Sequence, residues 1–160
     1  MPGVTSELHA TAESRVRSTG RRYTGQRRRL VDILSRAGSP QTIADILRGR
    51  RDLAQSSVYR NLAVLERAGV VNRVFADDEF ARFELTESLT GHHHHLICSN
   101  CGRVEDVAMP KSFERALNRT IDGLAEDAGF ATVSHRLDLF GRCRNCVGRS
   151  AGAVEAVSGG

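Results

Sequence analysis

The chain has 160 residues, of which 40% are hydrophobic and 5% aromatic, and it contains no Trp. This length suits one compact unit or two small domains with an aliphatic core. No apolar run approaches the roughly 20 residues of a membrane-spanning helix, and the polar N-terminus lacks the apolar segment of a secretory signal. We therefore expect a cytoplasmic protein with no membrane partner, in which the four cysteines are metal ligands rather than disulfides.

Charge is divided unevenly along the chain. Residues 1–75 contain fourteen Arg and six acidic residues, whereas residues 76–160 contain nine basic and thirteen acidic residues. Seven of the Arg, and no acid, fall within residues 14–31. A basic half joined to an acidic half indicates a polyanion partner for the first half. A solvated basic tail is the alternative, but the Arg run leads directly into a patterned helix, which favours nucleic acid.

The two ends of the chain differ from its middle. We expect residues 1–18 to form a disordered extension, and residues 148–160, which are small and rich in Gly and Ser, to form a flexible tail. Between them we predict two domains, at residues 19–87 and 88–147.

The first domain shows the pattern of a winged helix-turn-helix. Apolar residues at helical spacing predict three helices, at residues 24–36, 43–50 and 57–69. Their expected N-caps are Thr24, Thr42 and either Ser56 or Ser57. Residues 70–85 then read as two strands joined by an acidic turn at Asp77-Asp78-Glu79.

In such a module the third helix enters the major groove of DNA and the hairpin touches the backbone. Polar side chains off the apolar stripe of this helix are candidate contacts, namely Ser56, Ser57, Tyr59, Arg60 and Asn61. Arg27, within the Arg run, is a further candidate. A small helical bundle without a nucleic acid partner is the alternative, and the basic charge of this half disfavours it.

The second domain reads as a small α/β unit, which makes the whole chain α+β. Short strands are predicted at residues 96–100 and 104–108, and an amphipathic helix at residues 113–128. Residues 131–143 are expected to form a strand with one face made of Val133, His135, Leu137 and Leu139.

Two identical cysteine spacings point to a zinc site. Cys98-x-x-Cys101 and Cys143-x-x-Cys146 together offer four thiolates, which suit a closed tetrahedral Zn²⁺ site with a structural role. The metal would clamp the last turn of the domain to its first hairpin. A redox dithiol is the alternative, but no thioredoxin-like context precedes either pair.

The run His92 to His95 is internal and close to Cys98, so it is not a terminal tag. In an extended segment alternate side chains point to opposite faces. His92 and His94 would then serve one metal site, and His93 and His95 another. His135 could join one pair, and acids available to complete the sites include Glu84, Glu105, Asp106 and Glu114.

Taken together, these segments resemble the ferric uptake regulator (Fur) superfamily of metal-dependent repressors. The resemblance lies in YTGQRRRLVDIL, SSVYRNLAVLERAGVV, RFELTE, HHHHLICSNCG and VSHRLDLFGRCRNC, which cover residues 20–147 in the family's order. It implies an N-terminal winged helix, a dimerisation domain, and a homodimer that binds a palindromic double-stranded DNA operator when metal is loaded.

The resemblance also implies roles for single residues. The structural zinc would be held by Cys98, Cys101, Cys143 and Cys146. A regulatory site between the domains would take Glu84, His93 and His95. A further site in the dimerisation domain would take His92, His94, Glu114 and His135. DNA would be read by Tyr59 and Arg60, with Arg22 reaching the minor groove.

Departures from the family pattern bear on the sensed metal. Iron, manganese, nickel and peroxide-sensing members often carry a His just before the short second helix, where this chain has Ser39-Pro40-Gln41. Zinc-sensing members often supply an Asp and a Cys where Asn72 and Thr86 stand. Two His and one carboxylate can hold Zn²⁺, Fe²⁺, Mn²⁺ or Ni²⁺. Zinc is slightly favoured, and a peroxide sensor is disfavoured because its His and Asp ligands are not evident.

Two other classes of function are weighed against a regulator. A zinc deaminase needs an H-x-E triplet and a P-C-x-x-C, and neither is present. No nucleophile motif or Gly-rich phosphate loop occurs either, so we expect neither enzymatic activity nor a small-molecule substrate. A zinc store or metallochaperone without DNA binding is the second alternative, and the helix-turn-helix half disfavours it.

Overall fold

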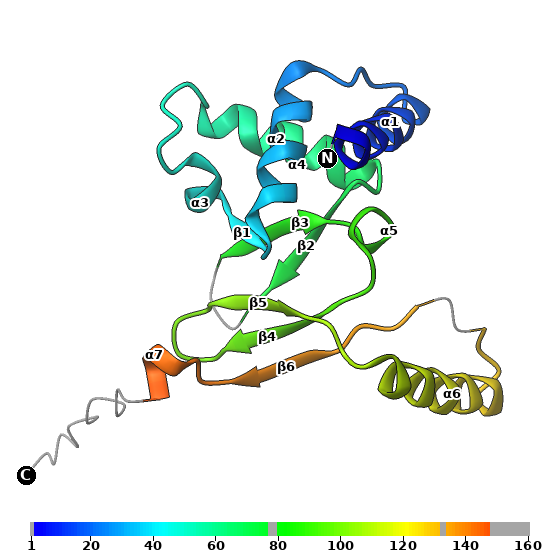
Figure 1. The fold of residues 1–160 in the computed structure, drawn as a ribbon. Helices are drawn as coiled ribbons and strands as arrows, with labels where there is room; N and C mark the ends of the chain where they lie inside the picture. The colour runs from blue at the N-terminus through cyan, green and yellow to red at the C-terminus, as the bar shows by residue number, and fades with distance from the viewer. Residues whose placement is uncertain (1, 77–79, 132–133, 148–160) are drawn as a thin grey trace, which may run out of the picture.

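The computed structural model describes residues 2–76, 80–131 and 134–147, and the side chains from residue 6 onward. These described residues form helices and two separate three-stranded sheets, as expected for an α+β fold. The helices of the first half lie above the first sheet in the view of Figure 1, the second sheet lies below it, and the long helix of the second half lies at one side of that second sheet. In the described part of the chain, no helix has the length and apolarity to cross a membrane.

The first half forms the predicted helix-turn-helix and wing. Its elements are α1 (Pro2–Ser18), α2 (Gly25–Ala37), β1 (Gln41–Thr42), α3 (Ile43–Leu47), α4 (Gln55–Arg67), β2 (Val71–Phe75) and β3 (Ala81–Leu85). The strand order is β1-β3-β2, with both pairs antiparallel. The central strand β3 is buried from Arg82 to Leu85. The acidic turn predicted at residues 77–79 lies outside the described residues.

Local signals set the ends of these helices. Thr24 caps α2 through its side chain, and Thr42 forms a reciprocal capping box with Asp45, as predicted. The predicted cap at Ser56 or Ser57 is wrong, because α4 begins at Gln55 after Ala54, which makes no side-chain cap. Helix α3 ends at Leu47 rather than at residue 50.

The expectation of a disordered extension before residue 19 is wrong, because α1 is a docked helix. Ala12 and Val16 are fully buried in the core of the first half. The buried His9 ring lies 2.8 Å from the Tyr23 hydroxyl at Nδ1 and 3.1 Å from Asp32 at Nε2. Burial raises the pKa of Tyr23 to about 12, so its hydroxyl keeps the proton that it can donate to His9. These tertiary contacts stabilise α1 as a helix, although its polar sequence does not predict one.

The second half is built on the sheet β5-β4-β6. Its elements are α5 (Glu87–Thr90), β4 (His94–Cys98), β5 (Val104–Val107), α6 (Lys111–Asp127), β6 (Asp138–Gly141) and α7 (Arg144–Val147). Strand β4 pairs antiparallel with β5 and parallel with β6. A small cluster of Val74 from the wing with Ile97 and Val104 joins the two halves.

The strand predicted at residues 131–143 is wrong over most of its length. Only Asp138–Gly141 are in β6, paired with His95–Cys98 of β4. Because β4 begins at His94, residues 134–136 lie beyond its end, and Leu137 makes a single backbone contact with it, its carbonyl accepting from His95 N at 3.4 Å. Val133 and the tail from residue 148 onward lie outside the described residues.

The docking of α1 can be tested through Val16. We expect Val16→Ala to lower the free energy of unfolding by about 1–3 kcal/mol, because it leaves a cavity in a closed core. Urea unfolding would measure the change. Val147→Ala, at a position that is 67% exposed, should change stability by less than about 0.5 kcal/mol. Equal stabilities for the two variants would show that α1 is not docked in solution.

Candidate metal centres

Three clusters of possible metal ligands occur among the described residues, and in each the ligand atoms all lie within 4.8 Å of one another. The first consists of Cys98, Cys101, Cys143 and Cys146. The second consists of Glu84, His93, His95 and Asp106. The third consists of His92, His94, Glu114 and His135. The structure therefore separates the four consecutive histidines in the alternating manner that the sequence predicts.

The cysteine cluster is preorganised for thiolate ligation. All four cysteines are free thiols. Backbone hydrogen bonds, the largest contribution coming from the amide of Cys143 at 3.3 Å, lower the pKa of Cys98 to about 6. For Cys101 a backbone hydrogen bond at Arg103 acts to lower the pKa, but the neighbouring thiols and burial raise it to about 11. A bound cation would favour the thiolate form of all four groups.

The sulfur spacing suits zinc. A tetrahedral ion with Zn–S bonds of about 2.3 Å holds its sulfurs about 3.8 Å apart. Cys101 Sγ and Cys143 Sγ are 3.8 Å apart. These two thiols, one from each CxxC turn, are thus at the separation that a tetrahedral Zn²⁺ ion requires.

The second cluster draws its members from both halves of the chain. Glu84 lies on the wing strand β3, whereas His93 precedes β4 and His95 lies on it. The Glu84 Oε2 atom is 3.2 Å from His93 Nε2 and 3.0 Å from His95 Nε2. Oxygen and nitrogen ligands about 2.0–2.1 Å from a tetrahedral ion would be about 3.3 Å apart. These atoms are therefore spaced as ligands of one ion, with the ion between the halves.

Asp106 completes this cluster, and our predicted regulatory set omitted it. It stands directly opposite His95 in the antiparallel pairing of β4 with β5, and its Oδ1 atom is 3.9 Å from His95 Nε2. Opposite residues on neighbouring strands share a face. The signal was present in the sequence as an available acid, but choosing it over Glu105 required the register of the hairpin.

A carboxylate outside the cluster orients His95. Asp138 Oδ1 is 3.1 Å from His95 Nδ1, and Arg136 holds the other oxygen of Asp138 at 2.7 Å. Such a partner fixes the tautomer and directs Nε2 toward the metal position. Glu87 is placed in the same way for the third cluster, 2.9 Å from His92 Nδ1.

Burial and neighbouring charges act in opposite directions on the pKa values of Glu84, His93 and His95 in the second cluster. Burial acts to raise the pKa of Glu84, but His95 and His93 outweigh it, so the pKa is lowered. For His95 burial acts to lower the pKa, and the carboxylates of Glu84 and Asp138 outweigh it, so the pKa is raised. The pKa of His93 is raised against burial by the Gly91 carbonyl and Glu84. Burial raises the pKa of Asp106.

The third cluster includes an orphaned buried oxygen. His92 Nε2 and His135 Nε2 are 3.2 Å apart, and Glu114 Oε2 lies 3.5 and 3.6 Å from them. His94 Nε2 is 2.7 Å from the other oxygen of Glu114. Within the described residues, the buried Glu114 Oε2 atom has no hydrogen-bond partner. A cation among these nitrogens would satisfy that oxygen, so the donor set fits a metal.

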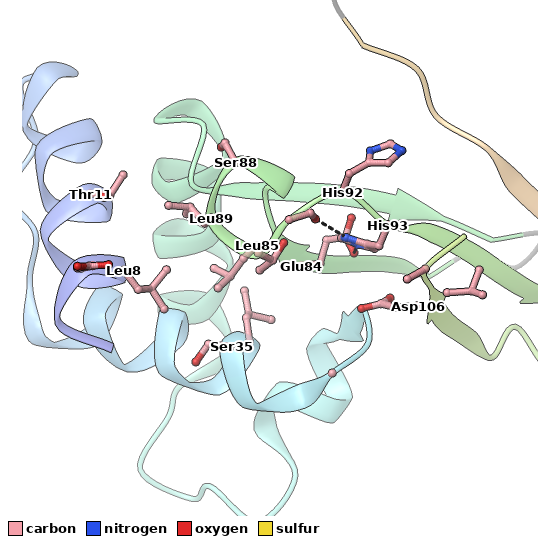
Figure 2. Close-up of a pocket in the computed structure, with 17 residues that line it drawn as sticks. Leu8, Thr11, Ser35, Glu84, Leu85, Ser88, Leu89, His92, His93 and Asp106 are labelled. Carbon is pink, nitrogen blue, oxygen red and sulfur yellow. Dashed lines mark hydrogen bonds and ion pairs between the residues drawn. The ribbon is translucent and has the colours of Figure 1, made fainter. Parts of the chain in front are cut away.

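A cavity of about 780 Å³ lies beside the second cluster. Figure 2 shows Leu8 and Thr11 of α1 on one side and Glu84, His93 and Asp106 on the other. Helix α1 therefore forms part of the surroundings of the metal position.

A sequence model of the ferric uptake regulator family matches residues 18–140. The chain belongs to the ferric uptake regulator family. It is a metal-responsive transcriptional regulator rather than an enzyme. The resemblance seen in the sequence is thereby confirmed.

Individual relatives support this placement in the Fur family. The chain is 31% identical over 139 residues to the ferric uptake regulation protein of Bordetella parapertussis, covering 84% of this chain and 95% of that protein. It is 30% identical over 144 residues to the peroxide operon regulator of Bacillus subtilis, covering 88% and 93%. The fold also matches the structure of the Helicobacter pylori ferric uptake regulator Fur, which is described as having three functional metal binding sites. The TM-score is 0.70 at 23% sequence identity, and the match covers 92% of this chain and 95% of that one. This last likeness shows the shared fold.

The predicted DNA-contact residues of this chain fall into two groups. Tyr59 and Arg60 on α4 are exposed, and so is Arg22 before α2. Ser57 donates to Gln26 at 2.8 Å. Arg27 donates to Asn61 at 3.1 Å and to the carbonyl of Arg22. The first group is presented to solvent, whereas Ser57 and Arg27 already bind protein groups that connect α2 to α4.

The second cluster predicts a pH dependence of stability for the chain stripped of labile metal. The lowered pKa of Glu84 contributes stability above its ordinary value of 4.5, which is lost as pH falls through the lowered pKa. The raised pKa values of His93 and His95 contribute stability below their ordinary value of 6.5, which is lost as pH rises through the raised values. We therefore expect the cluster to stabilise the metal-stripped chain most between pH 4.5 and 6.5.

Thermal unfolding from about pH 5 to about pH 8 would measure this effect as the difference between the chain and its His93→Ala/His95→Ala variant. With saturating Zn²⁺ the difference should grow as pH rises, because metal competes with protons for the imidazoles. A difference that does not change with pH in the metal-stripped proteins would contradict the proposed charge state of the cluster.

Proposed function

We propose that this chain is a DNA-binding repressor that acts in the cytoplasm as a homodimer and binds a palindromic operator when its regulatory site holds a metal. This proposal rests on one observation, which is that the residues of the second cluster come from both halves of the chain. Glu84 belongs to the wing of the DNA-binding half, whereas His93, His95 and Asp106 belong to the second half. One ion held by these residues would join the two halves.

Joining the halves bears on DNA binding through geometry. A dimeric helix-turn-helix protein must place its two recognition helices at the spacing of the operator half-sites. Fixing the angle between the halves fixes the position of α4 relative to the dimer axis. A metal acts as a switch only if it binds the DNA-competent arrangement better than the others, and ligands drawn from both halves provide that difference.

Separate roles follow for the three clusters. Cys98, Cys101, Cys143 and Cys146 would hold a structural Zn²⁺, since four thiolates leave no open coordination position. The second cluster would be regulatory. The third, with His92, His94, Glu114 and His135, would hold an additional ion within the dimerisation domain, which we delimit as residues 88–147.

Two imidazoles and two carboxylates in the second cluster can hold Zn²⁺, Fe²⁺, Mn²⁺ or Ni²⁺. We propose Zn²⁺ as the sensed ion and metal homeostasis as the controlled process. Asp106, which the sequence offered as an available acid but which our regulatory set omitted, stands in the cluster. A peroxide response therefore has an Asp ligand available, but no His precedes α3 at Ser39-Pro40-Gln41.

An unpartnered helix face supports the homodimer. None of the 17 residues of α6 is buried, although Phe113, Leu117, Ile121 and Leu124 recur at helical spacing. Phe113 is 45% exposed and Leu124 is 66% exposed. Contiguous apolar patches of this kind mark association surfaces. A second copy of the chain would cover this face, as the family resemblance implies.

The metal switch can be tested with DNA from upstream of the protein's own gene. After labile metal is removed and the zinc of the cysteine cluster is kept, we expect one buffered divalent ion to raise DNA affinity by at least about tenfold, as measured by fluorescence anisotropy. Zn²⁺, Fe²⁺, Mn²⁺ and Ni²⁺ are added separately.

In the same assay His93→Ala/His95→Ala and Glu84→Gln should reduce the metal stimulation to less than about twofold. Glu105→Gln, whose side chain pairs with Arg103 outside the cluster, should keep the stimulation. If DNA affinity is the same with and without every ion, the proposed switch is wrong. A metal-binding chain that shows no sequence-specific DNA retention would instead be a metal store.

The dimer surface can be tested on α6. Leu124→Glu introduces a charge into the apolar face, and we expect a monomer at micromolar concentration in analytical ultracentrifugation. Arg119→Glu changes charge by more but lies on the opposite side of the helix by its spacing, so this variant should stay dimeric. A dimeric Leu124→Glu variant would place the interface elsewhere.

A further inference from the structure

Arg15, on α1, contacts three groups that are distant in sequence. Its Nη1 atom is 2.7 Å from the Gly69 carbonyl, 2.9 Å from Ser88 Oγ and 3.3 Å from Thr86 Oγ1. Gly69, with a φ of 65°, lies in the turn that ends α4. Thr86 and Ser88 lie where the wing passes into the second half. One guanidinium therefore joins the end of the recognition helix to the connection between the halves.

That connection, which we call the hinge segment and define as residues 86–91, also contacts two metal clusters. Glu87 holds His92 of the third cluster at 2.9 Å. The Gly91 carbonyl accepts from His93 of the second cluster at 3.0 Å. The hinge segment is thus bound by Arg15 on one side and by ligand histidines on the other.

The helix that carries Arg15 is itself anchored. Ala12 and Val16 flank Arg15 in the helix and are fully buried. Six residues before Arg15, His9 binds both Tyr23 and Asp32 of the α2 region. Arg15 therefore extends from a fixed support, and its hydrogen bonds restrain the hinge segment relative to the whole DNA-binding half.

We propose that Arg15 is a positioning residue that transmits metal loading from the hinge segment to α4. This inference rests on the proposed metal-dependent DNA binding. With Arg15 in place, movement of residues 86–91 on metal loading must move the end of α4 with it. Without Arg15, the hinge segment is hydrogen-bonded to the end of α4 in the described part of the chain only through Thr86, which donates to the carbonyls of Gly69 and Val70, so an ion in the second cluster would fix the position of α4 less firmly. Arg15 precedes residues 18–140, the part matched by the family model, so the device belongs to the N-terminal helix of this chain.

The experiment compares Arg15→Ala with Arg17→Ala, in the full chain with the zinc of its cysteine cluster. Arg17 is a matched control, because it lies on the same helix, is exposed and pairs within α1, with Glu13 at 3.3 Å. For each protein, DNA affinity is measured by anisotropy with and without the ion that stimulates the parent chain. Metal affinity without DNA is measured by competition with a chromogenic chelator.

For Arg15→Ala we expect the metal stimulation of DNA binding to fall by at least about fivefold. Metal affinity and metal-free DNA affinity should stay within about twofold of the parent chain, which a merely destabilised protein would not show. Arg17→Ala should match the parent chain in all three quantities. Because the coupling is reciprocal, the effect of DNA on metal affinity should fall by the same factor.

A second variant, Ser88→Ala, keeps the test valid if Arg15→Ala does not fold, because it removes one acceptor from the Arg15 contact. It should lose part of the stimulation in the same direction. If Arg15→Ala folds and keeps the full metal stimulation of DNA binding, this proposal is overturned and the metal switch still stands. If Arg15→Ala does not fold, full metal stimulation in Ser88→Ala has the same meaning. A parent chain with no metal stimulation overturns both.

Discussion

The alternation of side chains along an extended backbone is the constraint on which the metal-binding half depends. Four consecutive histidines span the approach to β4 and its first two residues. Because successive side chains point to opposite faces, the run serves two clusters at once. Each cluster then needs partners on its own side. The wing and β5 supply Glu84 and Asp106 to one, and α6 and the segment before β6 supply Glu114 and His135 to the other.

Burial of charge explains why the second cluster holds together before any metal arrives. Glu84 is buried because β3 is the central strand of its sheet. A buried carboxylate must be paired, and the imidazoles of His93 and His95 pair with it across the boundary between the halves. Against the effect of burial, the Glu84 carboxylate helps to raise the pKa of both imidazoles, which favours their positively charged form when no metal is bound. The junction is therefore preformed, and metal binding becomes an exchange of protons for a cation.

Features fixed by short-range spacing could be predicted from the sequence, and features fixed by pairing between distant segments could not. The cysteine pairs, the helix-turn-helix pattern, the Thr24 and Thr42 caps and the division of the histidines all follow from local periodicity. Placing Asp106 in the second cluster required the register of β4 with β5. Predicting the length of β6 required knowing where β4 begins. Helix α1 was missed because few of its residues are apolar and its order comes from docking contacts.

The two histidine clusters share one backbone segment, residues 92–95. A change in the number of residues in this segment therefore disturbs the clusters more than a change of one residue type. Replacing one histidine removes a ligand from one cluster and leaves the other complete. Inserting or deleting one residue within the run, between His93 and His94, would invert the facing of the residues before the change relative to β4, whose own facing is held by its pairing with β5 and β6. His92 and His93 would then exchange sides, and both donor sets would be disrupted together. Substitutions in the run therefore leave the remaining histidines on their own faces, whereas a single-residue insertion or deletion within it moves histidines to the opposite face.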